Sequence, residues 1–321
     1  MMPAMPDEAA LGAWVVEKLG GRVARVDAVQ TLWSGYGRIL RFALAGADAA
    51  SAVVKHVTPP DVVRHPRGWG GDAGHQRKLR SYEVERAFYA GHAVDRAHRT
   101  ARCHAAESDG TGLRLLLEDL DFAGYGGRRS QLDDDELGRC LGWLASFHAA
   151  HLGRSTEELW QNGTYWHLAT RQDELRAMKD RALREAAAPL DAALRSCPYR
   201  TWVHGDAKVA NFCFAADDVA AVDFQYVGGG CGVQDVAYFL SSCLDDAACE
   251  RQAAALLDVY FAALRARLPG GVDGAAVERA WRALYPAAWA DFHRFLNGWA
   301  PDHWKLHGYT RRMTRQALDR L

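Results

Sequence analysis

The stretch "TWVHGDAKVANFCF", residues 201–214, places a polar cluster between two short apolar runs. Within it, Asn211 follows Asp206 after four intervening residues, and a second carboxylate, Asp223, stands in "VAAVDF" (219–224). Short runs rich in β-branched and aromatic residues favour strands. We therefore expect a strand, a loop, a strand, a turn and a strand, with the three oxygen-bearing side chains at one end of a small sheet.

These side chains suit phosphoryl transfer. Carboxylate and amide oxygens are ligands for Mg²⁺ rather than for zinc. A carboxylate that stays off the metal can accept the proton of an attacking hydroxyl. Positioning and charge neutralisation supply most of the catalysis of phosphoryl transfer. The alternative is a structural hairpin, because Asp and Asn also favour turns.

Length and composition narrow the class of protein. The 321 residues predict one large domain or two lobes. The formal net charge of -1 gives no reason to expect a nucleic-acid or membrane partner. Seven cysteines without a C-x-x-C pair argue against a disulfide framework or structural zinc and indicate a reducing, cytoplasmic location. No apolar run is long enough to predict a membrane span.

The two halves of the chain differ in their predicted secondary structure. Residues 23–33, 38–44, 51–57, 100–107 and 113–120 predict strands, residues 7–19 and 75–93 predict helices, and residues 59–75 predict a loop. After residue 130, helical patterns cover residues 133–152, 165–195, 233–268, 275–299 and 303–319. We therefore predict a small β-rich lobe (1–120) and a larger helical lobe (121–321).

Upstream features extend the phosphotransfer pattern. Lys55 comes late in the third predicted strand, and Glu83 and Glu85 on the following helix are both candidate partners. A glycine-containing turn at residues 34–37 lies between the first two strands, where nucleotide phosphates would lie. The run "LLLEDL" (115–120) stands at the lobe boundary, where backbone could bind an adenine.

Taken together, H-G-D-x-x-x-x-N (204–211) and the following Asp-Phe (223–224) resemble the motifs of kinase-like small-molecule phosphotransferases. These include aminoglycoside phosphotransferases, choline kinases and ecdysteroid-kinase-like proteins. The likeness is closest to the last group, through "SYEVERAFY", "LLLEDL", "HGD" and "VDFQYVGGGCGVQDVAYFL", and covers roughly residues 30–305. It implies an α+β, protein-kinase-like bilobal fold with the active site between the lobes.

The resemblance also implies roles in the second half of the chain. Asp206 matches the catalytic base, while Asn211 and Asp223 match the magnesium ligands. Asp235 matches a buried aspartate that braces the loop carrying the base. Lys208 is placed to reach the transferred phosphate, as in serine/threonine kinases, although a solvated loop lysine is the alternative.

Nucleotide contacts follow from the same resemblance. Lys55 matches the lysine on the α- and β-phosphates of ATP, and Glu85 matches its partner better than Glu83 does. The remaining implied nucleotide-binding residues are the turn residues Ser34, Gly35, Tyr36 and Gly37 and the hinge residues Glu118, Asp119 and Leu120.

The sequence thus predicts a Mg·ATP-dependent transfer of the γ-phosphate to a hydroxyl of a small molecule. Gly205 replaces the Arg of H-R-D, Gln225 replaces the Gly of Asp-Phe-Gly, and no long activation segment follows, which disfavours a protein substrate. The alternatives are an inactive, nucleotide-binding pseudokinase and a metal-dependent hydrolase. The acceptor and the oligomeric state are not fixed by these motifs.

An aromatic segment, residues 281–304, is a candidate wall for the acceptor. As a helix it gathers aromatic side chains on one face, and we expect Trp289 or Trp299 to face the acceptor, with Asp291 or Asp302 as a partner for an amine. Core packing of a late helix is the alternative.

Four further residues with reactive side chains have simpler predicted roles. His148 and His151 lie three apart on a predicted helix without an H-E-x-x-H motif, so we expect core or surface positions. Cys213 and Cys231 flank the motif, and we expect both to be buried structural thiols.

Overall fold

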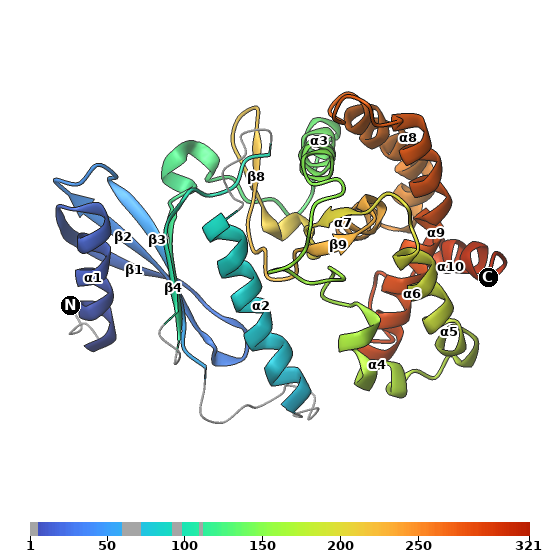
Figure 1. Cartoon of the computed structure of the whole chain (residues 1–321), viewed down its shortest axis with the longest axis horizontal. Helices are drawn as coiled ribbons and strands as arrows, with labels where there is room; N and C mark the ends of the chain where they lie inside the picture. Colours follow the sequence, from blue (N-terminus) through green and yellow to red (C-terminus); the bar gives the residue numbers. More distant parts are fainter. Residues whose placement is uncertain (1–5, 60–71, 92–97, 109–111) are drawn as a thin grey trace. The chain divides into compact units, whose positions relative to one another are not determined.

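The computed structural model of the chain describes residues 6–59, 72–91, 98–108 and 112–321. It divides into two compact units, residues 1–94 with 100–126, and residues 95–99 with 127–321 (Figure 1). Within the described ranges, no helix is both long enough and apolar enough to cross a membrane.

The first unit is built on an antiparallel five-stranded sheet. Its strands lie in the order β1-β2-β3-β5-β4, and Figure 1 shows α1 and α2 on opposite faces of this sheet. The elements are α1 (Pro6–Leu19), β1 (Arg22–Thr31), β2 (Gly37–Ala45), β3 (Ser51–Val57), α2 (Asp72–Gly91), β4 (Cys103–Ser108) and β5 (Leu113–Glu118).

Alternation along β3 decides which side chains face which helix. Ala52 and Val54 belong to the apolar core with Trp14 of α1. Since neighbouring side chains on a strand point to opposite faces, Lys55 points to the other face, which α2 covers. Lys55 pairs across the ladders with Ile39 on β2 and Leu115 on β5, so it occupies a central strand.

The predicted loop at residues 59–75 is partly wrong. Residues 60–71 lie outside the described part of the chain, but α2 already begins at Asp72. The acidic and small residues before His75 therefore form the first turn of the helix instead of the end of a loop.

The second unit is mostly helical. Its helices are α3 (Asp134–Ala150), α4 (Gln172–Ala177), α5 (Arg181–Glu185), α6 (Ala187–Arg195), α7 (Gly232–Cys243), α8 (Asp246–Arg265), α9 (Gly274–Trp299) and α10 (Gly308–Leu318). Sequence reasoning joined α7 to α8 and treated residues 165–195 as continuous helical texture. In the structure Leu244 and Asp245 separate α7 from α8, and residues 165–195 hold three short helices.

Two small sheets lie in the second unit instead of the one that we predicted. β6 (Thr201–Val203) pairs with β9 (Gly228–Gly230), and β7 (Phe212–Phe214) pairs with β8 (Val219–Ala221). β9 consists of three glycines, so it carries no strand signal in its side chains. A Cβ on Gly228 would lie 2.1 Å from the carbonyl oxygen of Trp160, which explains why only glycine fits there.

Candidate active site

The loop between β6 and β7, residues 204–211, carries the predicted base and is called the catalytic loop below. Gly205 has a φ of +79°, and a Cβ there would lie 2.2 Å from the carbonyl oxygen of Tyr226. Glycine is therefore required by both backbone conformation and space. This explains why the chain has glycine where the H-R-D pattern has arginine.

Asp235 holds the start of the catalytic loop. Its carboxylate is fully buried and accepts the backbone N–H of His204 at 2.6 Å and that of Gly205 at 2.9 Å. His148 Nε2 lies 3.1 Å from the same carboxylate, and His148 Nδ1 lies 2.8 Å from the hydroxyl of Tyr260. The predicted bracing position of Asp235 on α7 is confirmed.

Asp206 is a buried carboxylate with a partner on each oxygen. Lys208 Nζ donates to Oδ2 at 2.8 Å, and Asn211 Nδ2 donates to the same oxygen at 3.0 Å. The hydroxyl of Tyr238 donates to Oδ1 at 3.0 Å. Burial alone would lower the pKa of Lys208, but attraction and hydrogen bonding to Asp206 raise it overall, so Lys208 stays protonated at neutral pH.

Asn211 and Asp223 offer a donor set that suits Mg²⁺. Asn211 Nδ2 faces two acceptors, the backbone oxygen of Asp206 at 2.8 Å and its carboxylate at 3.0 Å, so Asn211 Oδ1 is turned away from both. The charge of Asp223 helps to raise the pKa of Lys208, which places this carboxylate near the catalytic loop. Asp223 also accepts a bond from Gln225 Nε2 at 2.6 Å.

The described residues contain no group of three or more His, Cys, Asp and Glu side chains that could hold a metal by themselves. Mg²⁺ needs no such cage, because phosphates and waters complete its octahedral shell. Asp223 also has a φ of +69°, a left-handed conformation that is strained for a non-glycine residue and is often found at functional sites. One amide oxygen and one carboxylate therefore fit a phosphate-bound Mg²⁺.

Lys55 and Glu85 form a buried ion pair in the first unit. Lys55 Nζ lies 2.6 Å from a Glu85 carboxylate oxygen, and their side chains are 7% and 2% exposed. Glu83 instead pairs with Arg86 at 2.9 Å. The structure thus has the pairing that the resemblance implied, on the face of the sheet that α2 covers.

The glycine-containing turn is only partly open to a ligand. A Cβ on Gly37 would lie 2.1 Å from the carbonyl oxygen of His56, so the close approach of β2 and β3 accounts for this glycine. Tyr36 is buried, and its hydroxyl lies 2.6 Å from His75 Nδ1. Ser34 and Gly35 have positive φ angles, and nothing lies within 4 Å of a Cβ built on Gly35. A phosphate contact at this turn would therefore fall on Ser34 and Gly35.

Some polar atoms of the predicted hinge residues already form hydrogen bonds with other residues of the chain. The Glu118 N–H donates to the carbonyl oxygen of Arg102 at 2.8 Å. The Asp119 carboxylate accepts from the Ser51 hydroxyl at 2.5 Å. Among the described residues, none accepts a bond from the Leu120 N–H. The Leu120 N–H is therefore open to the predicted adenine contact.

Tyr238 and Lys305 are site residues that sequence reasoning missed. Tyr238 lies on α7 three residues after Asp235, and this i, i+3 spacing places both on the side of the helix facing the catalytic loop. Lys305 Nζ lies 4.7 Å from the centre of the Tyr238 ring. The spacing from Asp235 was a usable signal for Tyr238, whereas nothing near Lys305 in the sequence indicated its position.

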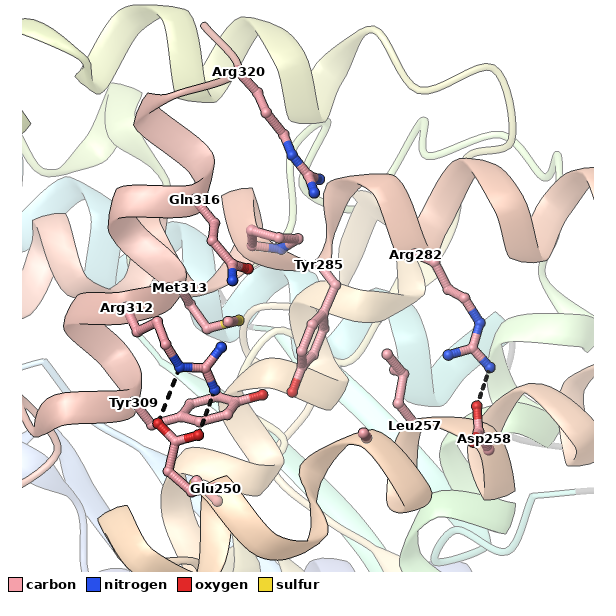
Figure 2. A pocket seen from close by; sticks show the side chains of 13 residues that line it. Glu250, Leu257, Asp258, Arg282, Tyr285, Tyr309, Arg312, Met313, Gln316 and Arg320 are labelled. Atoms are coloured by element: carbon pink, nitrogen blue, oxygen red, sulfur yellow. Dashed lines mark hydrogen bonds and ion pairs between the residues drawn. The ribbon is translucent and has the colours of Figure 1, made fainter.

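The aromatic segment is divided between two environments. Trp289 is fully buried, and its ring centre lies 5.1 Å from that of Tyr309 and 6.3 Å from that of Tyr285. Figure 2 shows Tyr285 and Tyr309 in a surface hollow lined by α8, α9 and α10, which none of the predicted site residues lines. For Trp289 the expectation of an acceptor contact is wrong, because this ring belongs to the core.

A contact between Trp299 and the acceptor stays a prediction. It is half-buried and packs against a cluster of Trp166, Tyr238, Phe292, Phe295, Leu296 and Leu306. Its ring stacks on that of Phe295, with the centres 6.1 Å apart. Asp291, in contrast, is buried and accepts from Arg294 Nε at 2.9 Å, so the expectation that it pairs with an acceptor amine is wrong.

The histidines and cysteines that we expected to be structural are buried. His148 and His151 are 0% and 2% exposed, and Cys213 and Cys231 are 2% and 0% exposed. His148 takes part in the Asp235 network described above. None of the seven cysteines forms a disulfide in the structure. These positions agree with the predicted core and structural roles.

Several solved structures share this fold at low sequence identity. A choline kinase from Cryptosporidium parvum Iowa II aligns with a TM-score of 0.58 at 10% identity, over 98% of this chain and 95% of that chain. A thermostable mutant of an aminoglycoside phosphotransferase, in complex with ADP and hygromycin B, aligns at 0.52 and 14% identity, over 97% and 98%. A microcompartment-associated aminopropanol kinase aligns at 0.51 and 13% identity, over 97% and 93%.

These likenesses confirm the kinase-like bilobal fold class. No curated protein sequence matches the chain, and the suggested closeness to ecdysteroid-kinase-like proteins stays a prediction. The model of the phosphotransferase enzyme family matches residues 79–274, which is more than half of the chain and includes the whole catalytic loop, Asp223 and Asp235. The chain therefore belongs to the phosphotransferase enzyme family.

Proposed function

We propose that this phosphotransferase transfers the γ-phosphoryl group of ATP, with Mg²⁺, to a hydroxyl group of a small molecule. The observation that carries the proposal is the environment of Asp206. Its buried carboxylate is oriented by Tyr238, Lys208 and Asn211, on a loop that Asp235 holds in place. A fixed carboxylate of this kind suits a general base for a hydroxyl group.

In the proposed reaction, Asp206 accepts the proton of the acceptor hydroxyl. The hydroxyl oxygen forms a bond to the γ-phosphorus as the bond from that phosphorus to the bridging oxygen of ADP breaks. Protonated Lys208, 2.8 Å from Asp206, is placed to donate a hydrogen bond to the oxygens of the transferred group. Its positive charge then stabilises the negative charge spread over those oxygens in the transition state.

We assign nucleotide binding to residues 1–120 and the chemistry and acceptor binding to residues 121–321. Lys55, fixed by Glu85, contacts the α- and β-phosphates in this proposal, and the Leu120 N–H contacts the adenine. Asn211 and Asp223 hold Mg²⁺, which neutralises phosphate charge when it is bound.

The relatives support a nucleotide and a small-molecule acceptor without identifying the latter. The aminoglycoside phosphotransferase named above was crystallised with ADP and hygromycin B, and the other two relatives are named as kinases of choline and aminopropanol. We propose no nucleic-acid or membrane partner. We place the reaction in the cytoplasm, where ATP is supplied and free cysteines stay reduced.

The test is ATP consumption by the purified protein, measured against a library of hydroxyl compounds with mass spectrometry of the products. A kinase gives ADP and a phosphorylated product only when an acceptor is present. A pseudokinase that serves as an interaction module binds nucleotide without turnover. A metal-dependent hydrolase acts without nucleotide. Either of the last two results would overturn the proposal.

A further inference from the structure

Lys305 is a half-buried cation that pairs with no carboxylate among the residues that the structure describes. It lies between α9 and α10, with its ammonium 4.7 Å from the centre of the Tyr238 ring and 5.5 Å from that of Phe292. No carboxylate of the described residues forms an ion pair with it. Aromatic faces attract a cation, but they replace only part of the hydration that burial removes. The site is therefore suited to an anionic group that the described residues do not supply.

Tyr238 connects Lys305 to the catalytic base. The face of the Tyr238 ring is turned to the ammonium, and the hydroxyl of the same residue donates to Asp206 at 3.0 Å. The charged or titratable groups that act on Lys305 are Asp206, Lys208 and Cys243. Burial lowers the pKa of Lys305 to about 8, with Asp206 opposing this shift and Lys208 adding to it, so Lys305 is mostly protonated at neutral pH. Burial raises the pKa of Cys243, so this thiol stays neutral.

Next to Tyr238 lies an aromatic surface formed by the half-buried rings of Tyr165 and Trp299 over the buried ring of Phe295. The Tyr165 ring centre lies 5.5 Å from that of Tyr238 and 5.3 Å from that of Phe295. Trp299 stacks on Phe295. A flat or apolar body could therefore pack here while its hydroxyl approaches Asp206.

The other cation near this surface is neutralised. Arg171 lies 5.0 Å from the centre of the Phe295 ring, but its guanidinium also bonds the buried carboxylate of Glu174 at 3.1 Å. Asp291 is likewise occupied by Arg294. Within the described part of the chain, Lys305 differs from Arg171 in that it forms no ion pair with a carboxylate, and the charge of Asp206 acts on it only from beyond ion-pair distance.

We propose that the acceptor carries an anionic group beside a flat or apolar body, and that Lys305 selects it against acceptors with an amine. That the bound molecule is a phosphate acceptor rests on the proposed phosphotransfer function. The anionic group that we assign to it rests only on residues of the second unit. A carboxylate or phosphate on the acceptor would supply the missing partner of Lys305, whereas an ammonium would be repelled by both Lys305 and Lys208. Without Lys305, the aromatic rings would favour a positively charged group on the acceptor. The positive charge of Lys305 favours a negatively charged group instead.

The test uses three para-substituted benzyl alcohols of matched shape: hydroxymethylbenzoate, methylbenzyl alcohol and aminomethylbenzyl alcohol. Binding of each to the full chain without nucleotide is measured by ligand-observed saturation-transfer NMR, and ADP formation with Mg·ATP is measured separately. We expect the wild-type protein to bind the carboxylate at least about tenfold more tightly than the amine, which corresponds to about 1.4 kcal/mol.

Variants of Lys305 then assign the preference. Lys305→Met should remove it, Lys305→Glu should invert it, and Lys305→Arg should keep it. Lys179→Met is the matched control, because Lys179 is exposed and should leave the preference unchanged. The arginine variant separates loss of charge from loss of folding, since it retains the cation and the long side chain.

Three results would overturn the inference. These are equal or absent binding of the three alcohols by the wild type, an unchanged preference in Lys305→Met, and an equal loss for all three alcohols in that variant. The last result would place Lys305 on the transferred phosphate instead of the acceptor. A carboxylate preference in binding without ADP formation from any alcohol supports the inference about Lys305 and counts against phosphotransfer, so the two failures are distinguishable.

Discussion

Asp235→Ala removes the acceptor of two buried backbone N–H groups, those of His204 and Gly205. A buried donor left without an acceptor costs about 1–3 kcal/mol, so two such donors cost about 2–6 kcal/mol. Loss of a fully buried carboxylate also removes its desolvation penalty, which offsets part of this cost. We therefore expect unfolding to become easier by about 2–4 kcal/mol, with His148 losing a partner as well.

The measurement is urea unfolding followed by circular dichroism, with the midpoint and slope compared between variants. Asp273→Ala is the matched control. Asp273 also stands at the start of a helix and accepts one backbone N–H, that of Ala276 at 3.0 Å, but it is exposed. Loss of such a cap typically costs about 0.5–2 kcal/mol.

Asp235→Asn refines the measurement, because it keeps one acceptor oxygen and turns an amide N–H₂ toward the other donor. We expect its stability to lie between those of the wild type and Asp235→Ala. If Asp235→Ala unfolds at the same urea concentration as Asp273→Ala, then Asp235 does not hold the catalytic loop and the reasoning from its hydrogen bonds is refuted.

Three further predictions concern the reaction itself. Asp223→Ala should abolish turnover and leave the melting temperature nearly unchanged; full activity at saturating Mg²⁺ would contradict the assignment of Asp223 as a metal ligand. Tyr238→Phe removes one hydrogen bond to Asp206, worth about 0.5–1.5 kcal/mol, so kcat should fall up to about tenfold with the KM for ATP unchanged, and an unaltered kcat would count against an orienting role. Since the charge of Lys305 is lost as the pH rises through its pKa of about 8, preference for the carboxylate-bearing alcohol should be present at about pH 7 and largely gone by about pH 9; a constant preference would exclude Lys305 as its source.

Local patterns in the sequence predict much of the fold and part of the site. The strands around Lys55 and the helix that carries Glu85 follow from local residue patterns. The choice of Glu85 over Glu83 as the partner of Lys55 came from the resemblance to kinases. The bracing role of Asp235 was also predicted, from the resemblance of "VDFQYVGGGCGVQDVAYFL" to kinase-like phosphotransferases. These features depend on residues that are close together in the sequence, so local sequence patterns are enough to predict them.

Features that depend on tertiary packing were missed. Lys305 meets Tyr238 across 66 intervening residues, and no local pattern encodes that approach. Strand β9 consists of three glycines, each of which a neighbouring residue approaches closely (Trp160 in the case of Gly228), so it has no side-chain periodicity to detect. Trp289 and Trp299 lie on the same helix, and only the packing of α10 and of Tyr238 around that helix places one in the core and the other at the aromatic surface.

The most direct test of phosphoryl transfer by Asp206 is a comparison of the wild type with Asp206→Asn in single-turnover assays with Mg·ATP, using an acceptor identified in the product screen. The variant keeps the shape of the side chain but lacks the proton-accepting carboxylate. General-base catalysis contributes roughly 10²- to 10⁴-fold, so the chemical step should slow by about that factor while ATP affinity changes little. A loss of less than about tenfold in the chemical step, well below that range, would contradict the role of Asp206 as the base.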